Sequence, residues 1–186
     1  MKREKSILRK EILRQRQSLS EIKWQTKSNL ICDRLANSSL VTQVNTIFAY
    51  FSFRKEADLS SLFFLNKNWA FPSCIGQSLV WNLWQPGEPL IQDKYGIKTP
   101  LKTASIVSIS SADLILVPTV ACDRQGYRLG YGGGFYDRML NASQGLNIPT
   151  IGVVFDLAYV AELPRESWDI KLDFACTETQ LFKHTN

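Results

Sequence analysis

The hydrophobic pattern of the first forty residues predicts two helices. Apolar residues recur near every 3.6 positions between residues 3 and 17, which is typical of an amphipathic helix. These apolar residues are Ile7, Leu8, Ile12 and Leu13. Ser18-Leu-Ser-Glu21 has the form of a capping box, with Ser18 as the first cap, and predicts a second helix that continues to about residue 36.

Apolar and β-branched runs further along the chain predict a sheet. Residues 113–117 form a continuous apolar run ended by Pro118, which is typical of a central strand buried on both faces. Trp81 and Trp84 are expected in the core of the sheet. Further strands are expected at 46–51, 70–72, 79–84, 150–155 and 174–177, and further helices at 58–66 and 135–141.

The order of these elements predicts the fold class. A strand, a glycine-rich segment, a helix and another strand follow one another in the second half of the chain. This order indicates an α/β fold, with a twisted, doubly wound, mostly parallel sheet, helices on both faces and two N-terminal helices. Ligands are then expected at the carboxyl ends of the strands.

Composition limits the class of protein. A chain of 186 residues with 45% hydrophobic residues is expected to form one compact domain over residues 1–186. The N-terminus lacks the apolar region of a signal peptide, and no stretch approaches the ~20 apolar residues that span a bilayer. We therefore expect a cytoplasmic protein without membrane contact.

The cysteines and the single histidine exclude several kinds of site. Four cysteines are widely spaced without a C-x-x-C motif, so a zinc site of ordinary spacing is excluded and a disulfide framework is not expected. His184 is the third residue from the end, in a tail that we expect to be frayed. Cys–His and Ser–His catalysis therefore have little support.

Positive charge is concentrated at the start of the chain. The formal net charge is +5, and residues 1–16 hold seven Lys or Arg against two Glu. Lys5 and Arg9 stand four positions apart, so on a helix they share one face and are able to bind a polyphosphate together. The alternative is an ordinary solvated helix face.

Residues 126–138, with the sequence Gly-Tyr-Arg-Leu-Gly-Tyr-Gly-Gly-Gly-Phe-Tyr-Asp-Arg, contain half of the ten glycines. Glycine loses the most conformational freedom on folding, so such a cluster indicates unusual dihedrals or a close approach of backbone to a ligand. The spacing fits neither G-x-x-x-x-G-K-[ST] nor G-x-G-x-x-G, so both standard nucleotide-binding loops are excluded.

The segment nevertheless has the properties of an anion site. Glycines entering a helix present several backbone N–H groups, and the helix N-terminus adds roughly half a positive charge. Arg128 is positioned to bind a phosphate, and Asp137 in the first helical turn to hold magnesium. Tyr131, Phe135 and Tyr136 offer rings for a flat heterocycle. The alternative is a tight connection in which Asp137 serves the helix dipole.

Three more carboxylates are candidates with open alternatives. Glu56 and Asp58 follow an aromatic cluster and are candidates to pair with the donors of a heterocycle. Asp58 is equally suited to cap the helix expected after it. Asp169 is either a turn residue or a ligand of a metal or water.

At this point the sequence resembles the 5-formyltetrahydrofolate cyclo-ligases, also called methenyltetrahydrofolate synthetases. Residues 117–138, Val-Pro-Thr-Val-Ala-Cys-Asp-Arg-Gln-Gly-Tyr-Arg-Leu-Gly-Tyr-Gly-Gly-Gly-Phe-Tyr-Asp-Arg, carry a long and specific signature. The resemblance covers nearly the whole chain. Its other parts are Lys5-Ser-Ile-Leu-Arg9, Glu56-x-Asp58, residues 96–100, Leu163-Pro164 with Asp169, and Thr177-Glu178.

The resemblance implies a compact α/β domain that converts 5-formyltetrahydrofolate to 5,10-methenyltetrahydrofolate with ATP and Mg²⁺, releasing ADP and phosphate. It implies magnesium at Asp137 and Asp169, a catalytic role for Arg128, and binding of the pterin end by Glu56. The implied folate site also includes Tyr131, Gly132, Gly133, Gly134 and Phe135. The implied ATP site consists of Lys5, Arg9, Arg128, Leu129, Gly130, Tyr131, Gly132, Gly133, Gly134, Phe135, Tyr136 and Asp137.

The chain departs from the common family pattern at four positions. Trp168 stands where many members have His, and Thr99 where Glu is usual. Tyr131 and Gly133 occupy positions that are often basic in relatives. Lys5, Arg9 and Arg128 are therefore expected to carry more of the phosphate neutralisation.

The expected partners are ATP and the folate, with no nucleic acid, and the chain is expected to be a monomer. One alternative is a non-catalytic relative that binds nucleotide or RNA, although residues 1–16 lack the stacking rings that single-strand binders add to charge. The other alternative is an ATP-dependent ligase that acts on a different heterocycle.

Overall fold

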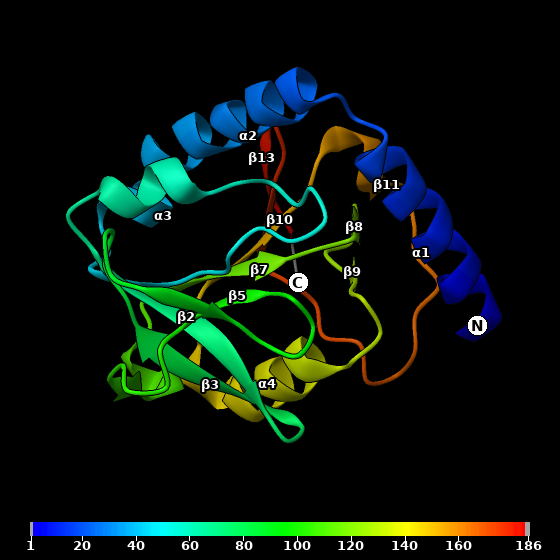
Figure 1. Cartoon of the computed structure of the whole chain (residues 1–186). Helices are drawn as coiled ribbons and strands as arrows, with labels where there is room; N and C mark the ends of the chain where they lie inside the picture. The colour runs from blue at the N-terminus through cyan, green and yellow to red at the C-terminus, as the bar shows by residue number, and fades with distance from the viewer. Residues whose placement is uncertain (1, 185–186) are drawn as a thin grey trace.

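Five parallel strands form the centre of the main sheet, and short antiparallel strands extend it at both edges. The computed structural model describes residues 2–184. The strand order is β13-β12-β10-β7-β1-β2-β3-β6, with parallel pairing from β12 through β2 (Figure 1). The strands are β1 (Thr46–Phe48), β2 (Asn68–Ile75), β3 (Ser78–Leu83), β6 (Ile106–Val107), β7 (Leu114–Pro118), β10 (Thr150–Val153), β12 (Phe174–Cys176) and β13 (Leu181–Lys183).

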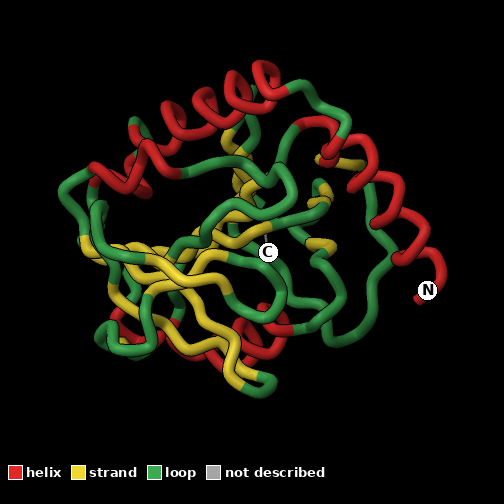
Figure 2. Tube along the Cα trace, viewed as in Figure 1, coloured by secondary structure: helices red, strands yellow, loops and turns green. Residues whose placement is uncertain are grey.

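Helices cover both faces of this sheet, as Figure 2 shows in red against the yellow strands. The helices α2 (Glu21–Ala36) and α3 (Ser39–Thr42) lie on one face, and α4 (Phe135–Ser143) lies on the other. Alternation along β7 explains this arrangement, because successive side chains of a strand point to opposite faces. Leu114 and Leu116 join the core under α2, whereas Ile115 and Val117 join the core with Leu140 of α4. The predicted α/β class and the two N-terminal helices are confirmed.

A small second sheet lies beyond the carboxyl ends of β7 and β10. Its order is β11-β8-β9, from the strands β11 (Tyr159–Val160), β8 (Ala121–Asp123) and β9 (Arg128–Leu129). The first helix, α1 (Lys2–Gln17), packs here rather than on the main sheet, because its buried Ile12 contacts the cluster that contains Val120, Ala121 and Leu129. A hairpin of β4 (Leu90–Gln92) and β5 (Lys98–Pro100) completes the strands of the described residues.

Several predicted boundaries are wrong. The residue that caps α2 is Ser20, whose side chain accepts a hydrogen bond from the Lys23 N–H, and not Ser18. The helix expected at 58–66 is a 3-10 turn, η1 (Ser60–Phe64), and Asp58 lies before it rather than at its cap. The first strand ends at Phe48 instead of residue 51. The remaining 3-10 turns are η2 (Ile109–Ser111), η3 (Gln144–Leu146) and η4 (Asp156–Ala158).

His184 does not lie in a frayed tail, contrary to the prediction. Its side chain is buried, and its Nδ1 lies 2.9 Å from the Leu172 carbonyl oxygen. The ring packs against Gly126, where an added Cβ would approach both groups. His184 thus serves the packing of the loop before β9. Trp81 and Trp84 are buried as predicted, and no helix of residues 2–184 is long and apolar enough to cross a membrane.

Candidate active site

A glycine loop (residues 130–134) connects β9 to α4 beyond the end of the main sheet. Gly132 has φ +98° and Gly134, the N-cap of α4, has φ +67°. Both lie in the left-handed region, which side chains other than glycine adopt only with strain. Glycine is therefore required at these two positions for the chain to enter α4 with its first N–H groups exposed, as an anion site needs.

Arg128 and Asp137 form an ion pair across this loop. Arg128 Nη2 lies 2.7 Å from Asp137 Oδ1, and the Arg128 side chain is only 3% exposed, compared with 29% for Asp137. The guanidinium lies over the Tyr136 ring, 5.6 Å from its centroid. Burial lowers the pKa of Arg128, and the Asp137 carboxylate opposes that shift. Arg128 thus lies behind Asp137 and holds it at the mouth of the loop.

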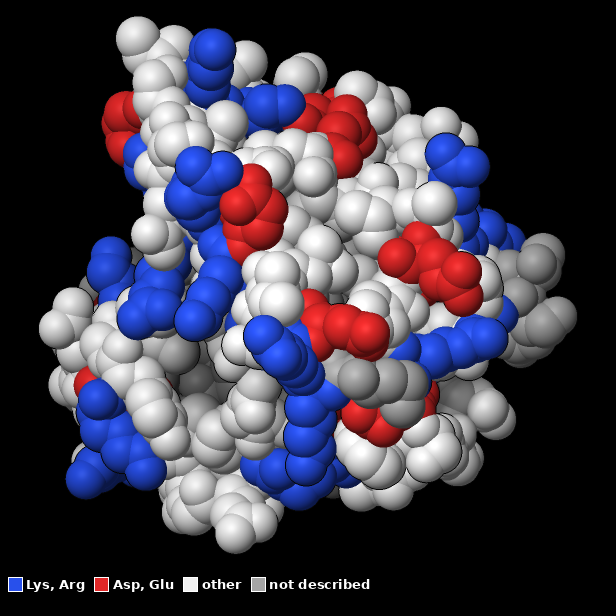
Figure 3. Space-filling model, turned by 90° about the vertical axis from the view of Figure 1, so that its right-hand side faces the viewer, with Lys and Arg blue, Asp and Glu red and all other residues white. Residues whose placement is uncertain are grey.

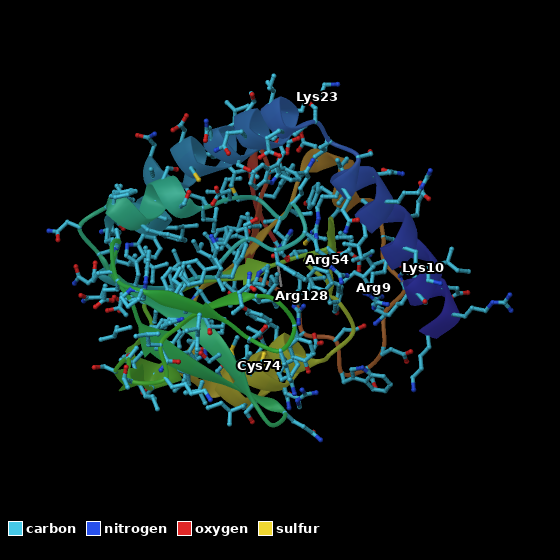
Figure 4. The ribbon with its side chains drawn as sticks, viewed as in Figure 1. Arg9, Lys10, Lys23, Arg54, Cys74 and Arg128 are labelled. Carbon is cyan, nitrogen blue, oxygen red and sulfur yellow. The ribbon has the colours of Figure 1, made fainter. Side chains whose placement is uncertain are left out.

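Helix α1 brings two more cations to the loop. Arg9 Nε donates to the Gly130 carbonyl oxygen at 2.7 Å, and Lys5 forms an ion pair with Asp169. Asp169 also accepts a hydrogen bond from the Glu166 N–H at 2.7 Å. Figure 4 shows Arg9 on the side of α1 that faces Arg128, with Lys10 on the outer side. Of the predicted pair, Arg9 therefore contacts the glycine loop, and Lys5 binds Asp169 beside it.

The two ion pairs belong to one cluster, because the charge of Asp169 also acts on Arg128. Cations and carboxylates alternate in it, so the site is nearly neutral in the absence of a ligand. On the side of the molecule that carries α1, Figure 3 shows a rim of Lys and Arg side chains around a hollow. Such a rim attracts anionic ligands and raises their local concentration.

Glu56 is a buried carboxylate next to Tyr131 of the glycine loop. Its side chain is buried, Oε2 accepts a hydrogen bond from the Phe53 N–H at 3.0 Å, and Oε1 has no partner among the described residues. Burial raises its pKa to about 7, while the charge of Arg16, the Phe53 N–H and the Tyr131 hydroxyl lower it. A buried carboxylate oxygen without a partner is costly unless a ligand supplies a donor.

The structure brings together the predicted charged residues. Lys5, Arg9, Arg128, Asp137 and Asp169 surround the glycine loop, and Glu56 lies beside Tyr131. The Leu129 side chain is buried in the core, so Leu129 can offer a ligand only its backbone.

Two aromatic residues of the predicted site differ in how they lie. Tyr136 is packed against Arg128 and Trp81, and its hydroxyl has no partner among the described residues. Phe135 lies edge-on to Tyr95 of the β4–β5 hairpin, with the ring centroids 6.5 Å apart.

Asp58 is not part of the site. Its Oδ1 accepts the Ser60 N–H at 3.0 Å, and its own N–H donates to Ser28. Asp58 therefore stabilises the turn before η1, although the cap position expected for it is occupied by Leu59.

Sequence reasoning missed Arg16, which is buried between the glycine loop and the turn before Glu56. Its Nη2 donates to the Tyr131 hydroxyl and its Nε to the Arg54 carbonyl oxygen at 3.1 Å. Arg16 follows Arg9 by seven residues, which is two helical turns, so it lies on the same face of α1. That spacing was the available signal.

Comparison with known proteins identifies relatives along the whole chain. The sequence model of the 5-formyltetrahydrofolate cyclo-ligase family matches residues 1–178. The 5-formyltetrahydrofolate cyclo-ligase of Haemophilus influenzae is 31% identical over 173 residues, which cover 89% of this chain and 92% of the relative. The enzyme of the same name from Mycolicibacterium smegmatis is 32% identical, over 94% of each chain.

A solved structure shares the whole fold. The 5,10-methenyltetrahydrofolate synthetase of Aquifex aeolicus superposes with a TM-score of 0.86 and 30% identity, covering 98% of this chain and 93% of that chain. The match therefore includes α1 and the small second sheet, and not merely the central parallel strands. By sequence and by structure, the chain belongs to the 5-formyltetrahydrofolate cyclo-ligase family.

Proposed function

We propose that this chain converts 5-formyltetrahydrofolate to 5,10-methenyltetrahydrofolate, with ATP hydrolysed to ADP and phosphate. Family membership supports the reaction. The observation that carries the assignment is the adjacency of two groups of residues, the cations around the glycine loop and the buried carboxylate of Glu56 beside Tyr131. Tyr131 lies between them, so both substrates would meet at this residue.

The glycine loop would hold the ATP phosphates. The backbone from Leu129 to Gly134 and the N-terminus of α4 offer N–H donors, and Lys5 and Arg9 reach the loop from α1. Arg128 adds positive charge from behind and orients Asp137. When ATP binds, phosphate oxygens would replace the Asp169 carboxylate as the partner of Lys5. Tyr131, Phe135 and Tyr136 would border the nucleotide.

Glu56 would bind the pterin end of the folate. The free Oε1 has the chemistry to accept a hydrogen bond from the N–H groups of a pterin, and its burial excludes water from that contact. Tyr131, Gly132, Gly133, Gly134 and Phe135 would form the side shared with ATP. This arrangement would place the formyl group of the folate against the γ-phosphate.

The chemistry needs no protein nucleophile. The formyl oxygen attacks the γ-phosphorus and ADP leaves; the N10 amine then attacks the activated formyl carbon, and loss of phosphate leaves the methenyl bridge. Three of the four cysteines are buried, and burial raises the pKa of Cys32 to about 11. Catalysis therefore rests on positioning and on cations that stabilise the transferred phosphoryl group.

Asp137 and Asp169 fit a magnesium ion that is shared with ATP. Residues 2–184 contain no cluster of three or more His, Cys, Asp or Glu, so a metal site made of protein alone is not available among them. Mg²⁺ typically binds through one or two carboxylates, substrate phosphates and waters, which matches two carboxylates beside a phosphate loop. The ion would neutralise charge on the phosphates.

We infer that the chain acts as a monomer on small molecules in the cytoplasm. Every residue of the proposed site comes from one chain, so no second copy is needed to complete it. The four cysteines are free thiols, which suits a reducing compartment. Size-exclusion chromatography with light scattering checks the monomer, and a dimer at micromolar concentration would contradict it.

The decisive experiment is a direct assay of the product. Purified protein is mixed with Mg-ATP and 5-formyltetrahydrofolate, and the near-ultraviolet absorbance of the methenyl product is followed. Product that requires both ATP and the folate supports the proposal. Well-folded protein that forms no product would sink it, and ATP turnover with other amides but not with this folate would indicate a different ligase.

A further inference from the structure

The turn that carries Glu56 has an unusual backbone. Arg54 has φ 48° and Lys55 has φ 55°, so two successive residues other than glycine occupy the left-handed region. Such a conformation is strained for a residue with a side chain and persists only where the surroundings fix it. Strain of this kind is concentrated at functional sites, so the contacts that hold residues 52–56 are informative.

Contacts from three segments hold this turn. The Glu56 carbonyl oxygen accepts hydrogen bonds from Trp24 Nε1 at 2.7 Å and from Ser52 Oγ at 2.8 Å. Lys55 Nζ donates to the Leu19 carbonyl oxygen. Arg16 Nε donates to the Arg54 carbonyl oxygen at 3.1 Å, which lies at the strained position itself. Arg16 is therefore one of the groups that fix the conformation of the turn.

Arg16 also holds the glycine loop. Its Nη2 donates to the Tyr131 hydroxyl, which lies 3.4 Å from the Phe53 carbonyl oxygen, within reach of donating to it. The guanidinium lies 5.7 Å from the centroid of the Tyr131 ring. A single buried side chain of α1 thus contacts both the turn that carries Glu56 and the glycine loop.

We propose that Arg16 is a positioning residue, which joins the turn carrying Glu56 to Tyr131 of the glycine loop. It would thereby align the Glu56 carboxylate, which binds the folate, with the glycine loop, which binds the ATP phosphates. The proposal rests on the proposed function. Arg16 is buried beneath the turn and the glycine loop, so it would act through Glu56 and Tyr131 and not by touching the reacting atoms. Its planar guanidinium donates in two directions at once, which the ammonium of lysine does not reproduce.

Electrostatics give the second reason. Glu56 interacts with Tyr50 after β1, Tyr131 of the glycine loop, Tyr136 of α4 and Arg16 of α1. Arg16 is the cation in this set, while the three others are hydroxyls. The positive charge of Arg16 therefore favours the ionised form of Glu56, against the desolvation that favours the protonated form.

The test compares Arg16→Gln and Arg16→Lys with Arg14→Gln, a matched control on the same helix. Arg14 is exposed and pairs with Glu11, outside the site. We expect Arg16→Gln to raise KM for 5-formyltetrahydrofolate about tenfold, with KM for ATP within about twofold. The acidic limb of the kcat/KM profile should also move to higher pH. Arg16→Lys should restore that limb, because it keeps the charge, but not the KM.

Hydrogen exchange on the free proteins tests the joining itself. Arg16→Gln should speed exchange in both segments 52–56 and 130–134, and Arg14→Gln in neither. Unchanged exchange, or faster exchange with the folate KM and the acidic limb unchanged, would overturn the proposal while the proposed function stands. Wild-type protein that forms no methenyl product would refute the proposed function, whereas the exchange data would still decide whether Arg16 joins the segments.

Discussion

Burial of the Glu56 carboxyl group lowers the free energy of unfolding at neutral and higher pH, where the group must ionise. Burial raises the pKa of Glu56 from 4.5 to about 7. Between these values the folded protein retains a proton that the unfolded chain has lost, so the free energy of unfolding falls as pH rises through this window. Well above pH 7 Glu56 is ionised in both states, and the free energy of unfolding no longer changes through this group. One pKa unit corresponds to about 1.4 kcal/mol, so a rise of about 2.5 units lowers the free energy of unfolding by roughly 3–4 kcal/mol.

The variant Glu56→Gln should therefore separate stability from activity. Glutamine cannot ionise, so we expect the variant to gain about 3 kcal/mol relative to wild type at pH 8 and much less at pH 5. Formation of the methenyl product should fall by at least about tenfold, because the folate loses its charged partner. Thermal unfolding at both pH values and the absorbance assay measure the two effects. An equal change in stability at pH 5 and pH 8 would contradict the assigned ionisation.

Among the charged residues around the glycine loop, Arg128 is the one whose removal should lower activity most. Its buried guanidinium holds Asp137, so Arg128→Ala leaves a cavity and a carboxylate without its partner. We expect kcat to fall by at least about tenfold and the melting temperature to fall as well. Lys10→Ala, on the exposed side of α1, is the control and should change neither. Similar losses in the two variants would argue against the role of Arg128.

At the scale of the element, the glycine loop depends on its two left-handed residues. An alanine at Gly132 has room, since its Cβ would lie 3.6 Å or more from Arg9, but φ +98° is unfavourable for it. We expect Gly132→Ala to cost roughly 1–2 kcal/mol and to raise KM for ATP, because the loop relaxes away from its conformation. Steady-state kinetics and chemical denaturation measure both.

Gly145→Ala is the matched control for that change. Gly145 has no positive φ, and an added Cβ would meet nothing within 4 Å. The control should leave KM for ATP unchanged and stability within about 0.5 kcal/mol. If Gly132→Ala behaves in the same way, the left-handed conformation of the loop is not needed for nucleotide binding.

The elements that the sequence predicts well are those with a strong local pattern. The run at 113–117 forms β7, and the periodic segment at 3–17 forms α1, although Ile7 of that segment is 60% exposed and Ile12 is its one fully buried apolar residue. The strands β8, β9 and β11 were missed, since two or three residues give no periodicity. Aromatic Phe63 enters the core from a 3-10 turn, which the helical spacing at 58–66 did not distinguish from a helix.

The site was predictable to the same extent. The spacing of Lys5 and Arg9 indicates a shared helix face, and the glycines indicate the loop that they face. The partners were not predictable, because Lys5 pairs with a residue 164 positions away and nothing local marks that contact. Arg128 and Asp137 are only nine positions apart, but their contact depends on the path of the glycine loop between them, which no periodic pattern specifies.

At the scale of the whole molecule, the site is assembled from three distant segments: α1, the glycine loop and the loop that contains Asp169. A ligand that touches all three should stabilise the folded state without a new domain contact. At a hundredfold excess over Kd, binding contributes about 2.7 kcal/mol. We therefore expect Mg-ATP to raise the melting temperature and to slow hydrogen exchange in α1 as well as in the loop.

Removal of the metal provides the contrast. With EDTA present, ATP should stabilise the protein less, because Asp137 and Asp169 then face the phosphates without an ion between them. Calorimetry with ATP, Mg-ATP and Mg²⁺ alone separates these contributions. Identical stabilisation by ATP with and without Mg²⁺ would argue against magnesium at these carboxylates.

The contact between Lys5 and Asp169 also has a consequence for synthesis of the protein on the ribosome. The N-terminal helix leaves the ribosome first, but the groups that it must contact in the glycine loop and beyond follow more than a hundred residues later. Contacts between residues so far apart in sequence form slowly, because the loop-closure entropy must be overcome first. We expect α1 to remain undocked during most of translation, and the nucleotide pocket to be among the last parts of the fold to close.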